Sequence, residues 1–151
     1  MIAIIQRVSA ASVIADGVPS GSIEKGLLVL LGVRQDDTKE KAELLARKTA
    51  ALRIFCDEND KMNLSLVDIG GEALVVSNFT LCADTKKGNR PSFIDAMAPD
   101  EANRLYEYFC CCLKQNGVER VETGVFGADM KIDMSCDGPV TITLNTDTWS
   151  K

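Results

Sequence analysis

The stretch that decides the fold of this chain is ALVVSNFTLCAD, residues 73–84. Its first part, Leu74–Val76, is a short apolar run with β-branched side chains, which predicts a buried strand. The strand then ends in the polar side chains of Ser77, Asn78 and Thr80. Leaving such groups buried without hydrogen-bond partners costs about 1–3 kcal/mol each. A ligand bound at the end of this strand would supply those partners.

The segment after the strand carries positive charge. It is TKKGNRPSF, residues 85–93, and it contains Lys86, Lys87 and Arg90 around a glycine. Together with the polar strand end, this loop has the composition of a pocket beside an anion-binding rim. A strand followed by a surface loop with solvated lysines has the same spacing, so the pattern alone leaves both interpretations open.

The residues that precede this stretch predict several strands and one helix. Residues 2–8 and 12–15 have the pattern of two strands, and Asp16-Gly17 is a tight-turn signal. The aliphatic run Gly26–Val33 predicts a central strand that is covered on both faces. A helix is predicted from Asp37, because an acidic cap with a glutamate three residues later resembles a capping box. Its apolar positions recur at steps of three or four and give one buried face; they are Ala42, Leu45, Thr49, Leu52 and Cys56.

The remaining segments add a hairpin, a second helix and a final group of strands. Residues 64–67 and 72–79 flank Gly70-Gly71, which is a hairpin signal. A second helix is predicted to begin at Pro99 and to stop at Asn116-Gly117. The order of strands, helix, strands, helix, strands favours an α+β fold in one domain, residues 1–151, with mostly antiparallel or mixed sheets and two main helices.

The composition excludes several kinds of protein. With 46% hydrophobic and 26% charged residues, the chain is typical of a folded globular domain. Its apolar runs are too short to span a membrane, and its first residues lack the basic start and cleavage site of a signal peptide. We therefore expect a cytoplasmic protein without a membrane partner. The net charge of −5 argues against a general nucleic-acid coat, because phosphate binding uses clustered lysine and arginine.

The chain has six cysteines and no histidine. No two cysteines form a Cys-x-x-Cys pair, so a structural zinc site is not expected. Without histidine, the Ser-His, Cys-His and His-ligated metal mechanisms are all excluded. If the chain is an enzyme, its base is a carboxylate, a lysine, a backbone group or the substrate itself, and no metal or other cofactor is predicted.

Seven short motifs occur along the chain in the order in which one family carries them. Besides the stretch at 73–84 they are IQRVSAASV (5–13), GLLVLLGV (26–33), LRIF (52–55), KMNLS (61–65), TGVFGADM (123–130) and DGPVT (137–141). On these motifs the chain resembles the D-aminoacyl-tRNA deacylases over nearly its whole length.

The resemblance implies an editing hydrolase. Such an enzyme cleaves the ester between a D-amino acid, or glycine, and the 3′-terminal adenosine of tRNA, and it spares L-aminoacyl-tRNA. The resemblance also implies a layered β/β/α fold and a homodimer with each active site at the subunit interface. The 2′-hydroxyl of the terminal ribose is expected to help activate the water, which agrees with the absence of histidine.

The same resemblance assigns roles to individual residues. Ser77, Asn78, Phe79 and Thr80 would line the pocket around the scissile ester, with Thr80 acting through its hydroxyl or its amide. The amides of Phe79 and Thr80 would stabilise the oxyanion. The other assignments are Arg7 as a support for the Gly138-Pro139 loop, Met130 as a pocket wall, and Lys86, Lys87 and Arg90 as contacts to tRNA phosphates.

Gly138-Pro139 would form the chiral filter of the family. In a cis peptide the two carbonyl oxygens can point the same way, although trans is the ordinary state of such bonds. This rigid pair, contributed by the partner subunit, would hold the ammonium of a D-residue and exclude an L side chain.

Two positions depart from the family pattern. Family members usually carry glutamine where this chain has Asn78, and asparagine where it has Cys136. A related branch with relaxed chirality control has asparagine in the first slot, so Asn78 bears on the substrate range. Cys136 removes a hydrogen bond expected in the Gly-Pro loop. Two other functions stay open: a non-catalytic dimeric tRNA-binding module, and a thiol hydrolase that uses Cys82.

Overall fold

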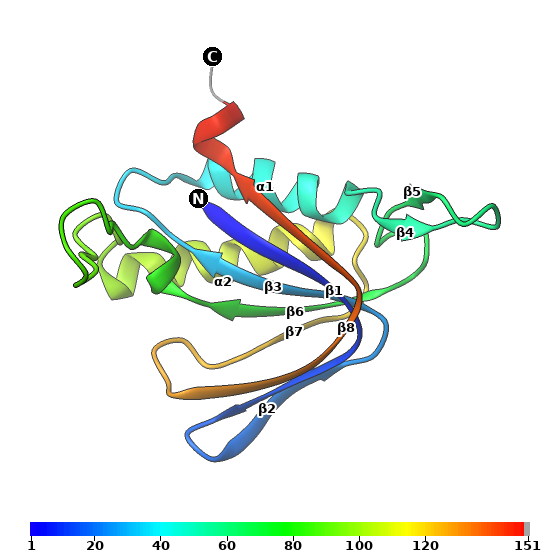
Figure 1. The fold of residues 1–151 in the computed structure, drawn as a ribbon, viewed down its shortest axis with the longest axis horizontal. Helices are drawn as coiled ribbons and strands as arrows, with labels where there is room; N and C mark the ends of the chain where they lie inside the picture. Colours follow the sequence, from blue (N-terminus) through cyan, green and yellow to red (C-terminus); the bar gives the residue numbers. More distant parts are fainter. Residues whose placement is uncertain (150–151) are drawn as a thin grey trace.

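The computed structural model describes residues 1–149 (Figure 1). The elements are β1 (Ile2–Ala15), β2 (Val18–Ile23), β3 (Gly26–Gly32), α1 (Lys39–Ala51), β4 (Phe55–Cys56), β5 (Met62–Leu64), β6 (Glu72–Ser77), α2 (Pro99–Gln115), β7 (Val121–Thr123) and β8 (Met130–Asn145), with the 3-10 turns η1 (Phe79–Cys82) and η2 (Thr146–Trp149). The predicted α+β class with two main helices is confirmed.

One mixed sheet organises the molecule around β1. The strand order is β2-β1-β3-β6-β7. Strands β3 and β2 pair with successive parts of β1, its first half and its second half. Strand β8 pairs with β1 along its whole length, on the opposite edge. The pairs of β1 with β2, β3 and β8 are antiparallel, whereas β3 with β6 and β6 with β7 are parallel. The long strands β1 and β8 therefore run side by side from one end of the molecule to the other.

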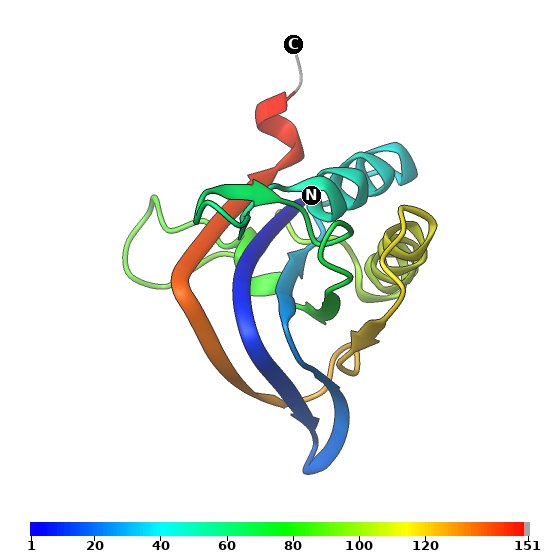
Figure 2. The same ribbon diagram turned by 90° about the vertical axis from the view of Figure 1, so that its right-hand side faces the viewer.

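The sheet is covered by helices on one face and by its own curled end on the other. Figure 1 shows α1 and α2 on one side, and Figure 2 shows β1 and β8 bending across the opposite side. The larger core lies between sheet and helices and includes Leu27, Val29 and Phe109. The smaller core lies inside the curl and includes Val13 and Leu28. Strand β3 contributes to both cores, so the prediction of a central strand covered on both faces is confirmed.

The N-terminal strands differ from the prediction in their number. Residues 2–8 and 12–15, predicted as two strands, belong to one continuous strand. The exposed Ser9 and Ala10 do not end it, because β1 is hydrogen-bonded to β8 on both sides of this point, through register shifts between Gln6 and Ala10. The Asp16-Gly17 turn is confirmed, with φ of 47° and 80°.

The predicted hairpin around Gly70-Gly71 is wrong. Strand β5 pairs with β4, while β6 pairs in parallel with β3. Ser65 and Asp68 explain the difference: the Ser65 amide donates to Oδ2 of Asp68 over 2.9 Å, and the Asp68 amide donates to Oγ of Ser65 over 3.1 Å. These two bonds form a turn that takes the chain out of one strand pair and into the main sheet.

The first helix begins one residue later than predicted. Its N-cap is Thr38, whose side chain accepts from the Lys41 amide. The predicted cap, Asp37, is instead buried beside the amine of Met1 at 2.5 Å. Ala42, Leu45 and Thr49 are buried on the predicted face, but Leu52 is the C-cap and Cys56 is exposed in β4.

The second helix agrees with the prediction at both ends. Pro99 is its first residue and Asn116 its C-cap, followed by Gly117 with φ +98°. Its buried side chains include Tyr106, Phe109 and Leu113. No helix within residues 1–149 is long and apolar enough to cross a bilayer.

Candidate active site

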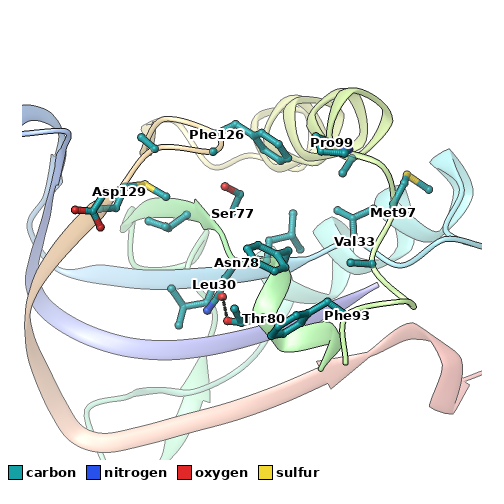
Figure 3. A pocket seen from close by; sticks show the side chains of 18 of the residues that line it. Leu30, Val33, Ser77, Asn78, Thr80, Phe93, Met97, Pro99, Phe126 and Asp129 are labelled. Carbon is teal, nitrogen blue, oxygen red and sulfur yellow. Dashed lines mark hydrogen bonds between the residues drawn. The ribbon is translucent and has the colours of Figure 1, made fainter. Parts of the chain in front are cut away.

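A cavity of about 860 Å³ lies at the carboxyl end of β6. This volume is within the range of small-molecule sites. Its walls are mostly apolar and come from β3, β6, η1, the segment that leads into α2, the β7–β8 connection and the start of β8. The larger side chains are Leu30, Val76, Phe79, Phe93, Met97, Phe126, Met130 and Ile132. Figure 3 shows Ser77, Asn78 and Thr80 at one side of this space and Phe126 at the other.

The polar rim of the cavity forms where β6 stops being a strand. Ser77 is the last residue of β6 and lies opposite Leu31 in the parallel register. The Asn78 amide still donates to the Leu31 carbonyl over 2.8 Å, but the Asn78 carbonyl accepts from the Leu81 amide over 3.3 Å. The chain thus turns directly from strand into 3-10 turn, which brings Ser77, Asn78 and Thr80 to one edge.

Two features give this rim its hydrogen-bonding character. The hydroxyl of Thr80 donates its proton to Oδ1 of Asn78. The hydroxyl oxygen of Thr80 can therefore accept a hydrogen bond from another group. Phe79 and Thr80 are the first residues of η1, and the first amides of a helical turn have no acceptor within it. The rim therefore combines two backbone donors with one hydroxyl acceptor.

An aromatic pair connects the rim to the cationic loop. Phe79, a residue that is 60% exposed, meets Phe93 edge-on with ring centroids 5.1 Å apart. The loop between them is closed by the bridge of Asp84 with Ser92. Lys86, Lys87 and Arg90 are exposed on this loop, and Lys86 borders a second, more polar pocket.

Gly138-Pro139 does not line the cavity that contains Ser77 and Thr80. It is a cis peptide in β8, and both residues are exposed. Arg7 holds this segment: its Nε donates to the Asp137 carbonyl over 3.0 Å, and its Nη1 donates to the buried Ile54 carbonyl over 2.8 Å. Within one chain, the predicted site residues thus fall into two separate groups.

The positions that depart from the family pattern have identifiable contacts. Asn78 binds Thr80, as described above. The thiol of Cys136 lies 3.8 Å from Oε1 of Gln6, which also accepts from the Thr141 hydroxyl over 2.7 Å. The weak thiol donor therefore shares an acceptor with a stronger hydroxyl donor.

The electrostatics argue against a thiol mechanism. Burial raises the pKa of the Cys82 thiol above its ordinary value, which keeps it protonated and unreactive. Its Sγ donates to the Val33 carbonyl over 3.5 Å, and Cys82 borders the polar pocket rather than the apolar cavity.

Among the described residues that line the cavity, only Asp129 has an ionisable side chain, and in Figure 3 its carboxylate points away from Ser77.

The sequence did not identify the far walls of the cavity. Phe93 and Met97 lie on the segment that returns from the cationic loop, and Phe126 packs on Tyr106 of α2 with ring centroids 5.9 Å apart. Phe126 belongs to a quoted motif, TGVFGADM, in which only Met130 was assigned a role. One signal in the sequence could have indicated this wall: Phe126 is an aromatic residue in an irregular segment that contains Gly124 and Gly127.

Comparison with known proteins gives one consistent result. The family model described as D-Tyr-tRNA(Tyr) deacylase matches residues 4–145. The D-aminoacyl-tRNA deacylase of Koribacter versatilis (strain Ellin345) is 57% identical over 143 residues, which is 95% of each chain. That of Shewanella baltica (strain OS195) is 58% identical over 144 residues, which is 95% of this chain and 99% of the relative.

Two solved structures resemble the chain closely. One, described as c-Myc DNA Unwinding Element Binding Protein, has a TM-score of 0.90 and 40% identity, and the match covers 96% of this chain and 98% of that one. The other, described as a probable eukaryotic D-amino acid tRNA deacylase, has a TM-score of 0.82. At 17% identity over 95% of this chain and 97% of that one, it shows the shared fold alone.

Proposed function

Since the chain belongs to the D-Tyr-tRNA(Tyr) deacylase family and is a hydrolase of that family, we propose that it hydrolyses D-aminoacyl-tRNA and glycyl-tRNA and spares L-aminoacyl-tRNA. In the reaction, water attacks the carbonyl carbon of the ester and the bond to the ribose 3′-oxygen breaks. That oxygen takes a proton, so the products are the free amino acid and tRNA.

The observation that carries this proposal is the polar rim at the end of β6. The amides of Phe79 and Thr80, as the first donors of η1, suit an ester oxygen that gains negative charge in the transition state. The Thr80 hydroxyl donates to Asn78 and so offers a lone pair to the attacking water. A nucleophilic Thr80 would need a base, but its hydroxyl proton is directed to a neutral amide, so Thr80 positions the water.

The chain supplies no histidine for proton transfer. The 2′-hydroxyl of the terminal ribose is adjacent to the scissile ester in any 3′-aminoacyl-tRNA. We propose that it helps to activate the water, while Ser77 and Thr80 orient the ester and the water. The substrate then contributes part of its own catalysis.

Chirality would be controlled by Gly138-Pro139 of a second copy of the chain. The segment is exposed and is not part of the lining of the chain's own cavity, which supports a role between subunits. Arg7 bonds the segment at the Asp137 carbonyl and is itself anchored by its bond to the Ile54 carbonyl. Its carbonyl oxygens would hold the α-ammonium of a D-residue and leave no room for an L side chain, while glycine would be accepted.

The acceptor end of the tRNA would approach along the cationic loop. Lys86, Lys87 and Arg90 are exposed and lie on the segment that links Phe79 to Phe93. A local basic rim is compatible with an acidic protein, because electrostatic attraction depends on nearby charges at physiological salt. Met130 would close the inner wall of the cavity.

The direct test is hydrolysis of D-tyrosyl-tRNA and L-tyrosyl-tRNA by purified protein. We expect release of D-tyrosine only. Thr80→Trp should abolish turnover because the indole fills the rim, while circular dichroism and dimer mass stay unchanged. Absence of turnover on D-aminoacyl-tRNA and glycyl-tRNA, with enzyme in large excess, would contradict the proposal.

The shared site has its own test. Gly138→Val is expected to be inactive, because a Cβ at Gly138 would lie 2.8 Å from the Val140 amide and 3.2 Å from Nη2 of Arg7. Mixing it with inactive Thr80→Trp and allowing subunits to exchange should restore about a quarter of the wild-type sites, since half of the dimers then contain one intact site. No recovery after proven exchange would rule out a site built from two chains.

A nucleic-acid-binding module without turnover is the second candidate. The observation in its favour is the 40% identical structure described as a DNA-unwinding-element binding protein. It predicts salt-sensitive binding of tRNA or single-stranded DNA through Lys86, Lys87 and Arg90, with no release of amino acid. The hydrolysis assay above separates the two candidates.

A further inference from the structure

The wall of the cavity opposite Thr80 is an irregular connection. It joins β7 to β8, and residues 126–130 line the cavity. Its own backbone forms one turn, in which the Ala128 amide donates to the Val125 carbonyl over 3.2 Å. Gly127 has φ +80°. Such a segment depends on its neighbours for a fixed position.

The β1–β2 hairpin holds both ends of this connection. The Asp16 amide donates to the Asp129 carbonyl over 2.8 Å, and the Asp129 amide donates to Oδ1 of Asp16 over 3.1 Å. At the other end, Oγ of Ser20 donates to the Thr123 carbonyl over 2.9 Å. Figure 1 shows the hairpin turn beside the β7–β8 connection.

Asp16 both forms the turn of the β1–β2 hairpin and bonds Asp129 of the cavity wall. The turn places it at φ +47°, a conformation that aspartate, asparagine and glycine adopt more readily than other residues. The two bonds to Asp129 form a closed pair, in which each residue donates its amide to the other. One of them has a carboxylate acceptor, and charge-assisted bonds are the stronger kind. Both contacts pass from the hairpin to a residue of the cavity wall.

The position of Asp129 determines that of Met130. Met130 is the next residue and begins β8 opposite Ala15. Its sulfur lies so close to Gly124 that a Cβ added there would be 2.6 Å from Sδ. A shift of the connection would therefore move the Met130 side chain within the cavity.

We propose that Asp16 is a positioning residue, which fixes the β7–β8 wall against the part of the substrate that does not react. This inference rests on the proposed function, because its main readout is deacylation. An interaction made equally in ground and transition states affects KM and leaves kcat unchanged. Loss of the Asp16 contact should therefore raise KM.

The experiment compares three variants. Asp16→Gly keeps the turn geometry but removes the side-chain oxygen that accepts from the Asp129 amide. Asp16→Asn keeps the turn geometry and also keeps a side-chain oxygen as acceptor. Asp60→Gly is the matched control, because Asp60 has φ +57° in the turn between β4 and β5, where its amide donates to the Asp57 carbonyl over 3.0 Å. We expect Asp16→Gly to raise the KM for D-tyrosyl-tRNA about three- to tenfold, the size of one lost hydrogen bond. Asp16→Asn should stay within about twofold of wild type.

The possible outcomes distinguish failure of the positioning role of Asp16 from failure of the proposed deacylase function. An unchanged KM in Asp16→Gly overturns the inference, as does a fall in kcat at constant KM, which indicates a smaller folded fraction. If the wild type hydrolyses no D-aminoacyl-tRNA, the proposed function fails, and hydrogen exchange then decides the inference separately. The Asp129 amide should exchange faster in Asp16→Gly than in Asp60→Gly; equal rates would overturn the positioning role.

Discussion

Asp37 is a single residue that joins three parts of the chain. Its side chain is fully buried, with Oδ1 2.5 Å from the Met1 amine and Oδ2 accepting from the Arg34 amide over 2.6 Å. The Met1 amine also donates to Oγ1 of Thr146 over 2.7 Å. The start of the chain, the residues before α1 and the first residue of η2 therefore meet at one buried ion pair, that of Met1 with Asp37.

Removing that charge should be costly. Asp37→Asn leaves a buried ammonium without its counter-ion, and breaking a buried pair typically costs about 3–5 kcal/mol. Urea unfolding at neutral pH measures the free energy of unfolding. Asp36→Asn is the control: its carboxylate is 79% exposed and 3.8 Å from Lys41, so its loss should cost less than about 1 kcal/mol. Equal effects of the two variants would show that the buried pair contributes nothing special.

Asn78 gives a second prediction for a single residue. Its Oδ1 fixes the rotation of the Thr80 hydroxyl, so Asn78→Ala should lower kcat/KM about tenfold through loss of one hydrogen bond in the transition state. Stability should change little, because the side chain is only half-buried. Steady-state kinetics on D-tyrosyl-tRNA provide the measurement, and an unaltered kcat/KM would show that Thr80 needs no partner.

Among the elements, α2 and β6 are joined by a buried hydroxyl. The Tyr106 hydroxyl donates to the Val75 carbonyl over 2.7 Å, two residues before the polar rim begins. Burial raises the pKa of Tyr106 well above its ordinary value of 10.0 and that of Cys110 to about 12 from 9.0. Helix α2 thus carries two groups that the fold keeps neutral.

These shifts predict a loss of stability at high pH. A group whose folded pKa is raised contributes fully below its unfolded pKa, and its contribution disappears as the pH rises towards the folded value. The free energy of unfolding should therefore be steady below about pH 9 and fall above it. Tyr106→Phe should make the fall smaller, although it costs about 1 kcal/mol at neutral pH through the lost hydrogen bond. Urea titrations from pH 7 to about 10.5 test this; identical slopes in both proteins would contradict it.

The sequence predicted elements better than their partners. The periodicity of α2 and the apolar run of β3 were sufficient, because both are local signals. The hairpin predicted from Gly70-Gly71 was wrong because strand pairing depends on strands distant in sequence. Strand β6 pairs with β3 and not with β5. Asp37 was predicted as a helix cap, since nothing local shows that Met1 lies beside it.

The candidate site divides in the same way. Ser77 to Thr80 were identifiable as a polar strand end, a feature that a short window contains. Phe93, Phe126 and the contact of Asp16 with Asp129 were not identifiable, because these residues meet only after the sheet curls. The two groups at Thr80 and Gly138 were linked by resemblance, not by spacing.

For the whole molecule, the net charge of −5 disfavours RNA binding, whereas in the proposed function the loop with Lys86, Lys87 and Arg90 would attract the tRNA phosphates. Reversing all three charges should weaken tRNA binding and reduce the slope of log K against log salt by about 2–3, because each neutralised phosphate releases counterions. Filter binding at several salt concentrations measures the slope.

The control for this variant is Lys114→Glu. Lys114 lies in the last turn of α2, whereas Pro99, at the opposite end of that helix, lines the cavity. Its reversal changes the net charge but should leave the salt slope unchanged. A proportional loss of slope per reversed charge in both proteins would mean that the loop is not the contact.

The pairing of β1 with β8 has a consequence for synthesis on the ribosome. Strand β1 is translated before β8, yet its full-length partner is residues 130–145. Until those residues are translated, one edge of β1 is an open template for other nascent chains. Pairs so distant in sequence also form slowly. The sheet, and with it the cavity wall that ends at Met130, is therefore completed only when translation of β8 ends.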